Sequence, residues 1–485
     1  MQRTWLKDIL VLTLILGGLF FILLGTRPLF VPDEGRYAEI AREMVASHDY
    51  VTPYLNGIKY FEKPVLFYWL ESAAIHLGGL NVWSIRCVNA LLGLIGCLLT
   101  YLTVSSLYNR NTGLLAAFIL GTSTLYFVMS HMISLDLPVT LFLSLTLYAF
   151  LLGINTEQPA RRRLFLWAAS IAAACAVLTK GLIGIVFPIM IIAIWMTLMG
   201  EWRLLSRLYL PSCILIFLCI AAPWHILVGT RNPEFFYFYF IKQHFLRYTT
   251  LKIGHYQPVW FFIPMLIAGF FPWIIFLPQT LLSLWRQHKN KLDNFFLIWA
   301  LFIFIFFSFS KSKLIPYILP VFPPLAILTA RYLEKAYKHR YKTIVIMIAT
   351  TWLCLLLALS AVPYLDTRTI LPLANRLNSL LTKQDEVVAY NQYYQDLPFY
   401  LQRRITILNW KNELTYGMQH QDTHEWMITD KTFWQRFHSK QRLFILMGKK
   451  EYENFIIRHP NEHAYLIDQT TTNVLISNYL PSLTH

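Results

Sequence analysis

Long apolar runs separated by short basic loops constrain the fold of this chain more than any other feature. Several runs approach the roughly 20 residues that an α-helix needs to cross the hydrocarbon core of a bilayer. Only 14% of the residues are charged and the mean hydropathy is +0.47, whereas a globular protein needs more charge to solvate its surface. A transmembrane barrel would show short alternating segments instead. The sequence therefore predicts a polytopic α-helical membrane protein.

The apolar runs predict about eleven transmembrane helices. Their ranges are 8–26, 87–107, 112–130, 137–154, 164–180, 181–199, 208–228, 258–283, 294–309, 313–330 and 343–363. The first run is long for a signal peptide and no small-residue cleavage site follows it, so we expect an uncleaved span. Segment 65–79 contains Glu71 and is too short to span, which places it in the membrane interface.

Basic residues gather in alternate loops, which is typical of cytoplasmic loops and argues against nucleic-acid binding despite the net charge of +16. These residues are Arg3, Lys7, Arg110, Arg161, Arg162, Arg163, Arg203, Arg207, Arg286, Lys289, Lys291, Arg331, Lys335, Lys338, Arg340 and Lys342. The opposite, extracytoplasmic side then carries the first loop (27–86), segment 229–257 and the C-terminal region.

The composition changes after about residue 364, where strand-length apolar runs (EVVAY, RITIL, RLFIL and NVLIS) alternate with helical stretches. We therefore expect a transmembrane domain over 1–363 and a small extracytoplasmic α/β domain over 364–485. All six cysteines lie in apolar segments without CxxC spacing, which predicts neither a disulfide framework nor a cysteine metal site.

The first loop is the main candidate for chemistry, because it sets Asp33, Glu34, Glu62 and Lys63 beside the first span. Its residues 36–46 read as an amphipathic helix on the membrane surface. The loop's tyrosines fit an interfacial aromatic belt, and those that flank the acids, Tyr37 and Tyr60, can also bond a sugar or a phosphate.

Cations on the extracytoplasmic side are exceptions to the loop pattern and suit an anionic group such as phosphate. They are Lys63, Lys180, Lys242, His244, Arg247, Lys311 and Lys313. The alternative is that each lysine reaches toward lipid headgroups.

A second acid, Asp136, opens a span on the same side as Asp33. It either caps the following helix or joins Asp33 in binding a divalent metal or a developing cation. Glu62 and His244 are one carboxylate and one imidazole that can ligate a metal such as zinc.

Several segments in chain order are similar to the lipid A aminoarabinose transferase family, a GT-C membrane glycosyltransferase family related to protein O-mannosyltransferases. They are VPDEGRYAEIAREM, GIKYFEKPVLFYW, SLDLP, LTKGLIG, QHFLRY and YNQYYQDLPFYLQR. The resemblance implies transfer of a sugar from an undecaprenyl-phosphate carrier on the periplasmic face of the bacterial inner membrane. In aminoarabinose enzymes the acceptor is a lipid A phosphate, and the modification raises polymyxin resistance.

The resemblance also implies roles for single residues. Asp33 and Asp136 match the family's catalytic acids, and Tyr37 and Tyr60 match its loop tyrosines. The basic residues that the family is expected to have near the carrier phosphate match Lys63, Lys180 and Arg247. The glutamate and the histidine expected at a divalent metal match Glu62 and His244. Family members are usually longer, with more spans after the catalytic core, which leaves the sugar and the acceptor open.

Two alternatives stay open at this point. A protein O-glycosyltransferase of the same superfamily would use the same donor chemistry on a hydroxyl acceptor. A transporter or flippase for a lipid-linked sugar would explain many spans, but it would be expected to show inverted repeats, and the sequence has no internal repeat.

Overall fold

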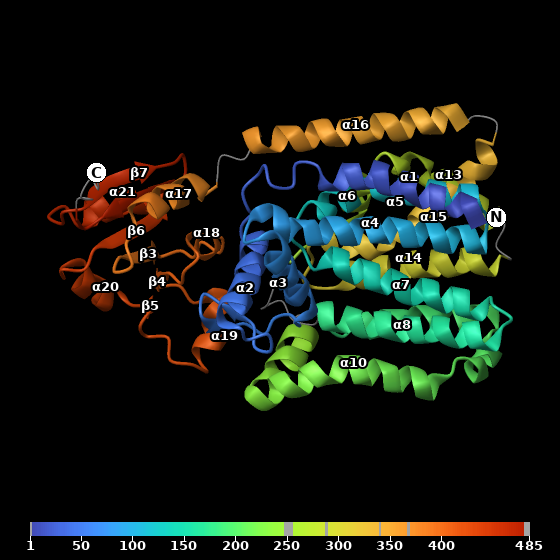
Figure 1. Cartoon of the computed structure of the whole chain (residues 1–485), viewed down its shortest axis with the longest axis horizontal. Coiled ribbons are helices and arrows are strands. Elements are labelled where there is room, and N and C mark those ends of the chain that lie inside the picture. The colour runs from blue at the N-terminus through green and yellow to red at the C-terminus, as the bar shows by residue number, and fades with distance from the viewer. Residues whose placement is uncertain (1, 247–255, 287–289, 339–340, 366–368, 480–485) are drawn as a thin grey trace. The chain divides into compact units, whose positions relative to one another are not determined.

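The computed structural model describes residues 2–246, 256–286, 290–338, 341–365 and 369–479 (Figure 1). Its contacts form two compact units. The helical unit contains Met1–Leu24, Phe61–Leu70 and Arg86–Ser360. The mixed unit contains Gly25–Tyr60, Glu71–Ile85 and Ala361–His485. Most residues of the first loop thus belong to the same unit as the C-terminal residues. The domain boundary predicted between residues 363 and 364 stays a sequence prediction.

The helical unit is built from helices joined by short connections. They are α1 (Gln2–Phe21), α4 (Val82–Leu107), α5 (Arg110–Thr122), α6 (Thr124–Ser130), α7 (Asp136–Ile154), α8 (Pro159–Lys180), α9 (Ile183–Met199), η1 (Trp202–Arg207), α10 (Leu210–Arg231), η2 (Tyr237–Leu246), η3 (Val259–Phe261), α12 (Phe262–Gly269), η4 (Trp273–Phe276), α13 (Leu277–Arg286), α14 (Lys291–Phe309), η5 (Ile315–Val321), α15 (Phe322–Ala336) and α16 (Tyr341–Leu365). The axes of α4, α7, α8 and α10 run nearly parallel in Figure 1.

Six of the described helices are long and apolar enough to cross a membrane: α4, α7, α8, α10, α14 and α16. Two further predicted spans are bent pairs of helices, each a broken span or a re-entrant loop. Range 112–130 bends by 68° between α5 and α6, where Ser123 is extended, and range 258–283 bends by 107° before η4, where Pro272 lies. The remaining three ranges are covered by α1, by the shorter α9 and by η5 with α15.

Burial separates the central helices from those that face lipid. The apolar window of α7 is 78% buried, whereas those of α10 and α16 are 22% and 17% buried. Large apolar side chains on these two helices are exposed, among them Leu215, Ile226, Ile346 and Leu357. Exposed leucine and isoleucine along a whole helix suit hydrocarbon and not water. The chain is therefore a multi-pass membrane protein with α7 at its core.

The C-terminal part of the mixed unit is an α/β fold around a six-stranded sheet in the order β5-β4-β3-β6-β8-β7. The strands are β3 (Glu386–Tyr390), β4 (Thr406–Leu408), β5 (Met427–Ile428), β6 (Leu443–Gly448), β7 (Tyr465–Gln469) and β8 (Asn473–Ser477). The first four in this spatial order pair in parallel, and β8 and β7 add antiparallel. The predicted α/β domain is confirmed, and its four predicted strands are β3, β4, β6 and β8.

Helices and turns complete this part of the unit. They are α17 (Leu371–Leu380), α18 (Leu397–Leu401), η6 (Asn412–Leu414), α19 (Thr415–Met418), α20 (Asp430–Phe437) and α21 (Lys449–Arg458). Two helical stretches lie between the strand-length runs of the sequence: QDLPFYLQ contains α18, and KKEYENFIIR coincides with α21. Buried strand residues such as Val388 and Ile445 pack with Phe433 and Phe455 of the helices, which forms the core.

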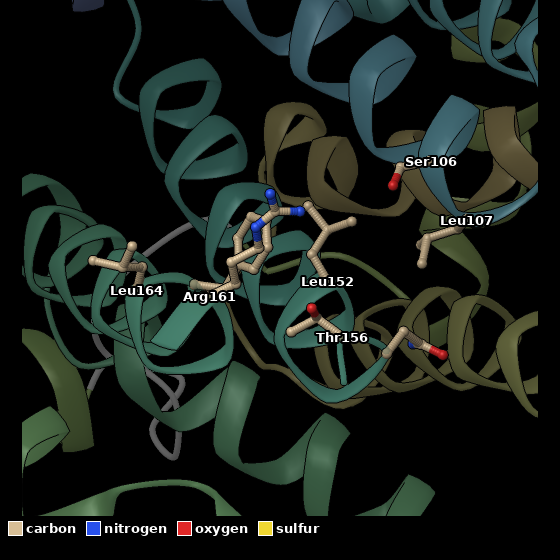
Figure 2. A pocket seen from close by; sticks show the side chains of 8 residues that line it. Ser106, Leu107, Leu152, Thr156, Arg161 and Leu164 are labelled. Carbon is tan, nitrogen blue, oxygen red and sulfur yellow. The ribbon is translucent and has the colours of Figure 1, made fainter. Parts of the chain in front are cut away.

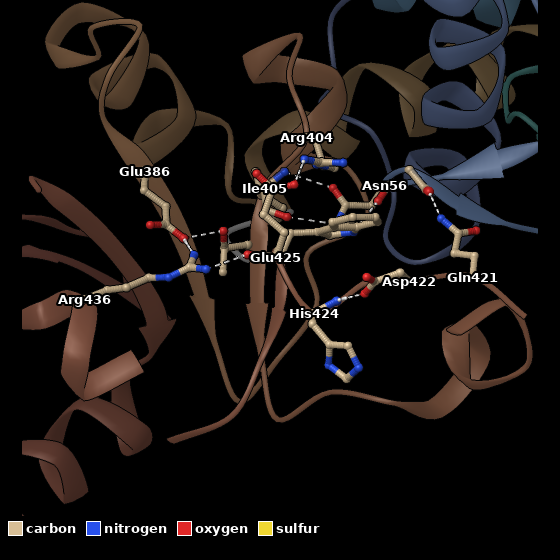
Figure 3. Close-up of polar contacts among 12 residues, drawn as sticks. Asn56, Glu386, Arg404, Ile405, Gln421, Asp422, His424, Glu425 and Arg436 are labelled. Carbon is tan, nitrogen blue, oxygen red and sulfur yellow. Dashed lines mark hydrogen bonds and ion pairs between the residues drawn. The ribbon is translucent and has the colours of Figure 1, made fainter. Parts of the chain in front are cut away.

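The first-loop part of the mixed unit contains α2 (Asp33–Ser47) and a hairpin of β1 (Tyr54–Leu55) and β2 (Ile58–Lys59). Asn56 and Gly57 make the turn with positive φ angles of 52° and 75°, the usual chemistry of a two-residue hairpin. The Asn56 side chain donates to the Ile405 carbonyl and accepts from the Ile405 amide, both at 3.0 Å (Figure 3). The hairpin is thus tied to the C-terminal part of the same unit.

A second set of contacts strengthens this attachment. Gln421 Nε2 donates to the Gly57 carbonyl at 2.6 Å, and Trp426 Nε1 donates to the Asn56 carbonyl at 3.0 Å. The guanidinium of Arg404 lies 3.9 Å from the centre of the Trp426 ring. These bonds satisfy the turn's backbone groups, so the hairpin and the C-terminal fold form one body.

Segment 65–79, predicted to lie in the interface, forms the short helix α3 (Leu66–Gly78). Its 13 residues are too few to span the bilayer, as expected.

Candidate functional site

In the helical unit, the acid Asp136 and the base Lys180 form an ion pair. Asp136 is the first residue of α7 and Lys180 is the last residue of α8, and these helices pack antiparallel, so the two side chains meet at one end. Lys180 Nζ donates to Asp136 Oδ1, and both side chains are largely buried. Lys180 Nζ also lies 4.5 Å from the centre of the Tyr317 ring.

The capping alternative for Asp136 fits the structure less well than the ion pair. The N-cap position of α7 is Leu135, which makes no side-chain cap bond. The Ser134 hydroxyl accepts from the Asp136 amide at 3.1 Å and lies 3.3 Å from its carboxylate. After Lys180, Gly181 ends α8 with φ +94°, a conformation that other residues rarely adopt.

The other extracytoplasmic lysines have different surroundings. Lys313 is buried, and its ammonium donates to the carbonyls of Gln257 at 2.8 Å and Ser310 at 2.6 Å. Lys311 is exposed, and Lys242 lies 6.0 Å from the Tyr237 ring centre. Lys313 therefore holds the turn before η5, which is a structural role.

Glu62 and Lys63 follow β2 and are half-buried in the helical unit. The side chain of His244 and all of Arg247 lie outside the described residues. Among the residues that are described, no three His, Cys, Asp or Glu side chains form a group that could hold a metal ion. The predicted ligand pair of Glu62 and His244 stays a prediction.

In the mixed unit, Asp33 begins α2 with a half-exposed side chain. Arg36 lies 3.2 Å from the Asp33 carboxylate and also pairs with Glu413, so one guanidinium holds two acids. Tyr37 and Tyr60 are buried in the same unit. The structure therefore groups Asp33, Tyr37 and Tyr60 in one unit, and Glu62, Lys63, Asp136 and Lys180 in the other.

Glu34, next to Asp33, is fully buried and fixes the entry to α2. Both its oxygens accept from the Arg27 guanidinium, at 2.7 and 3.2 Å, and Oε2 also accepts from the Phe30 amide at 2.8 Å. Behind it lies Glu71, also buried, whose oxygens have no hydrogen-bond partner among the described residues. Burial raises the pKa of Glu71 well above its ordinary value, and the Glu34 carboxylate raises it further.

A second buried acid pair lies along α2. Arg42 donates to both oxygens of Glu39, at 2.7 and 2.6 Å, and the Gly57 amide donates to both oxygens of Glu43. Burial and the neighbouring Glu39 carboxylate raise the pKa of Glu43 well above its ordinary value. The predicted surface helix thus buries most of its polar side, because these charges find partners within the unit.

Sequence reasoning missed Arg27, Arg42 and Asp396 as parts of this region. A signal was available for Arg42, which follows Glu39 by three residues, and such pairs meet on a helix. Arg27 lies before α2, so its pairing with Glu34 has no such signal. Asp396 lies in the quoted motif YNQYYQDLPFYLQR, but its burial follows only from the fold.

Comparison with protein-family models finds two matches along this chain. Residues 6–239 match the dolichyl-phosphate-mannose-protein mannosyltransferase family, and residues 373–478 match the aminoarabinose transferase C-terminal domain. The order of the two matches agrees with a membrane region followed by a C-terminal α/β fold.

Among curated proteins, the chain is similar to enzymes named undecaprenyl phosphate-alpha-4-amino-4-deoxy-L-arabinose arabinosyl transferase. The one from Pectobacterium carotovorum is 34% identical over 339 residues, which cover 69% of this chain and 60% of that protein. One from Proteus mirabilis is 36% identical over 319 residues, covering 65% and 57%. The chain's match thus spans about three fifths of the length of these relatives.

Among solved structures, ArnT from Cupriavidus metallidurans, bound to undecaprenyl phosphate, matches with a TM-score of 0.85 and 27% identity. The match covers 97% of this chain and 98% of that one. The archaeal oligosaccharyltransferase AglB from Archaeoglobus fulgidus matches with a TM-score of 0.54 at 12% identity, which concerns the fold alone.

The helical unit, the α/β fold and these likenesses define the class: this is a GT-C type membrane protein related to the protein mannosyltransferases. Within that class the chain is ArnT-like, since the C-terminal family model, the curated relatives and the ArnT structures agree on the aminoarabinose transferases.

Proposed function

We propose that this chain is a glycosyltransferase that moves 4-amino-4-deoxy-L-arabinose, or a related sugar, from an undecaprenyl-phosphate carrier to a phosphate of lipid A. The observation that carries this proposal is the likeness to ArnT over 97% of the chain. The ion pair of Asp136 and Lys180 supports it, because it fixes a cation that can pair with a phosphate at one end of α7 and α8.

The proposed reaction is a single displacement with inversion at the anomeric carbon. An oxygen of the acceptor phosphate forms the new bond to that carbon while the bond to the carrier oxygen breaks, and the electron pair leaves on undecaprenyl phosphate. The carbon acquires oxocarbenium character, as in other glycosyl transfers. The leaving phosphate needs neutralisation of charge, which Lys63, Lys180 and Arg247 would provide.

The two acids have different tasks in this proposal. Asp136 holds the Lys180 ammonium by its ion pair, which presents a fixed cation to the phosphate. Asp33, half-exposed at the start of α2, would stabilise positive charge on the donor sugar. An ionised phosphate acceptor needs no general base, whereas a hydroxyl acceptor would require Asp33 in that role. Tyr37 and Tyr60 would bond the sugar or the phosphate.

A divalent cation, such as zinc, remains part of the proposal, with Glu62 and His244 as its ligands. When bound, it would add positive charge beside the carrier phosphate. Metal analysis of the purified protein and of its Glu62→Gln variant checks this. Equal metal content in the two proteins would show that Glu62 is not a metal ligand.

We also propose that the chain lies in the bacterial inner membrane, with the candidate site and the C-terminal fold facing the periplasm. The loop charges support this orientation, because the basic loops alternate with the loops that carry the candidate residues.

Mass spectrometry of lipid A from cells with and without the gene tests the proposed function. We expect a sugar-sized addition with the intact gene, and its loss with Asp33→Ala or Asp136→Ala although both variants insert in the membrane. Exposed acids serve as controls: Glu157→Ala in the helical unit and Asp422→Ala in the mixed unit should retain transfer. Normal transfer by either site variant would contradict the site.

Two other results would contradict the reaction itself. Unchanged lipid A with altered glycoproteins would indicate a protein O-glycosyltransferase. Translocation of the lipid-linked sugar without transfer would indicate a flippase.

A further inference from the structure

A cavity of about 550 Å³ lies in the helical unit, between the C-terminal ends of α4 and α7 and the N-terminal end of α8. Figure 2 shows Leu152, Thr156 and Arg161 around one space, with Ser106 and Leu107 on α4. Its walls combine apolar side chains with a guanidinium and hydroxyl groups. This is the chemistry of a site for an amphiphile.

The cavity is separate from the candidate catalytic residues. Asp136 begins α7 and Lys180 ends α8, whereas Thr156 follows α7 and Arg161 lies in the first turn of α8. The 19 residues of α7 correspond to a length of about 28 Å at 1.5 Å per residue. The two places are therefore at opposite ends of the same spans, beside opposite leaflets of the bilayer.

Three consecutive arginines, Arg161, Arg162 and Arg163, lie at the start of α8, whose first turn contains no acidic residue. The positive end of the helix dipole disfavours cations there, so a bound anion would be stabilising. Two of the three have partners within the protein. Arg162 donates to the Thr156 carbonyl at 2.9 Å, and the Arg163 guanidinium lies 5.1 Å from the Trp167 ring centre.

Arg161 is different, because among the described residues its guanidinium has no hydrogen-bond, ion-pair or ring partner. The same holds for the hydroxyls of Thr156 and Ser106, which line the cavity with it. One cation and two hydroxyl donors without a partner in the described part of the protein thus line one space, where Arg161 and Ser106 are exposed and Thr156 is half-buried. Phosphate oxygens accept from both kinds of donor.

The apolar walls select the kind of phosphate compound. Leu152, Leu164 and Phe165 line the cavity at the end of membrane-spanning helices, a position at which lipid acyl chains would contact them. A second cavity of about 290 Å³ shares Leu107 but contains both signs of charge, since Arg331, Glu334 and Lys335 line it and Arg331 pairs with Asp293. In the part of the chain that the structure describes, the cavity beside Arg161 is lined by a cation and by no acid. Basic pockets between spans near one leaflet are typical sites for anionic lipid headgroups.

We propose that the cavity beside Arg161 binds the headgroup of an anionic phospholipid, such as phosphatidylglycerol, in the leaflet opposite to Asp136 and Lys180. The Arg161 guanidinium pairs with the lipid phosphate, the hydroxyls of Thr156 and Ser106 donate to it, and the acyl chains continue along Leu164 and Phe165. This inference is independent of the proposed sugar transfer.

Native mass spectrometry of the full-length protein in detergent tests the proposal by counting retained lipids. The probes are dioleoyl-phosphatidylglycerol and dioleoyl-phosphatidylcholine, which share acyl chains and differ in headgroup charge. One cation near an anionic headgroup contributes about 1 kcal/mol, so Arg161→Gln should weaken phosphatidylglycerol binding about fivefold. Arg161→Lys should retain most of it.

Arg163→Gln is the matched control, since it removes an arginine of the same turn that already contacts Trp167. We expect phosphatidylglycerol binding within about twofold of the unchanged protein, because the Arg161 site stays intact. Thr156→Val gives a second test with little change in volume, and it should weaken binding without affecting phosphatidylcholine.

Three results would overturn the proposal: equal retention of the two lipids, an unchanged affinity in Arg161→Gln, or equal losses in Arg161→Gln and Arg163→Gln. Complete displacement of the lipid by millimolar inorganic phosphate would also overturn it and indicate a site for a soluble phosphate compound. No sugar donor enters these measurements, so loss of transfer activity and loss of lipid binding are distinguishable.

Discussion

At the scale of single residues, Asp396 is a buried carboxyl group whose side chain has neither a hydrogen-bond nor an ion-pair partner among the described residues. It occupies the N-cap position of α18 but makes no side-chain cap bond, and neither carboxyl oxygen has a hydrogen-bond partner among the described residues. Burial raises its pKa from 3.8 to about 7. The folded state therefore binds more protons than the unfolded state between these values, and the charged form is the destabilising one.

This pKa predicts how stability depends on pH. The folded state keeps its full stability at this site below about pH 4, where Asp396 is neutral in both states. As the pH rises through about 7, the free energy of unfolding falls by at most about 4 kcal/mol. Asp396→Asn stays neutral, so its gain in thermal midpoint over the unchanged protein should grow from pH 5 to pH 8. Scanning fluorimetry in detergent measures it, with exposed Asp422→Asn as control; a pH-independent difference would contradict the buried charge.

The candidate residues show how far a sequence identifies a site. Asp136 and Lys180 stand out because acids and bases at the extracytoplasmic ends of spans break the loop pattern. Their ion pair depends on how α7 packs along α8, which no local pattern contains. Glu71 carries no signal beyond an acid in an apolar segment, because its burial beside Glu34 arises from contacts between distant segments.

At the scale of elements, α2 agrees with its prediction on one face and differs on the other. Tyr37, Ile40 and Met44 are buried as the amphipathic pattern predicts, but Glu39 and Arg42 are buried as well. The pattern assigns charged residues to water, and the fold instead pairs them within the mixed unit. The β1–β2 hairpin was missed although Asn56-Gly57, the strongest short hairpin signal, lies at its turn.

The contact between α2 and α18 is close enough to test. A Cβ on Gly35 would lie 2.6 Å from the Asp396 amide nitrogen, a distance that real side chains do not tolerate. Gly35→Ala should therefore destabilise the protein by about 1–3 kcal/mol, even though alanine favours helices. Gly18→Ala in α1 is the matched control, since no atom lies within 4 Å of its Cβ position, and its thermal midpoint should not fall.

Thermal unfolding in detergent compares the two variants of helical glycines. If Gly35→Ala and Gly18→Ala have the same thermal midpoint, α2 can move away from α18 without a loss of stability. That result would contradict the close packing of the two helices. A lower midpoint for Gly35→Ala alone would support it.

At the scale of the whole molecule, the sequence predicts the class of fold well, because bilayer thickness dictates the length of apolar runs. All eleven predicted ranges carry helix, and the α/β fold follows from strand-length apolar runs. The bends at 123 and near 270 were not predicted, since both segments are as apolar as straight spans. The grouping of residues 25–60 with the C-terminal residues also depends on contacts, such as those of Asn56 and Gln421.

The orientation of the whole molecule in the membrane leads to the last prediction. Arg161, Arg162 and Arg163 follow the α7–α8 connection, where Glu157 is exposed, and Lys411 is exposed before η6 in the C-terminal fold. Arginine-rich short loops stay in the cytoplasm, so Glu157 should face the cytoplasm and Lys411 the periplasm. Because the six native cysteines include exposed Cys219 and Cys354, both substitutions belong in a background in which all six are alanine.

In intact spheroplasts, a membrane-impermeant maleimide should label Lys411→Cys and leave Glu157→Cys unlabelled. Permeabilisation of the membrane should then expose Glu157→Cys to the same reagent, which shows that its thiol is reactive. The reverse pattern would place the basic loops outside, and Asp136 and Lys180, at the other end of α7 and α8, would then face the cytoplasm. A periplasmic transfer reaction at those residues would be impossible in that arrangement, so the labelling pattern bears directly on the proposed function.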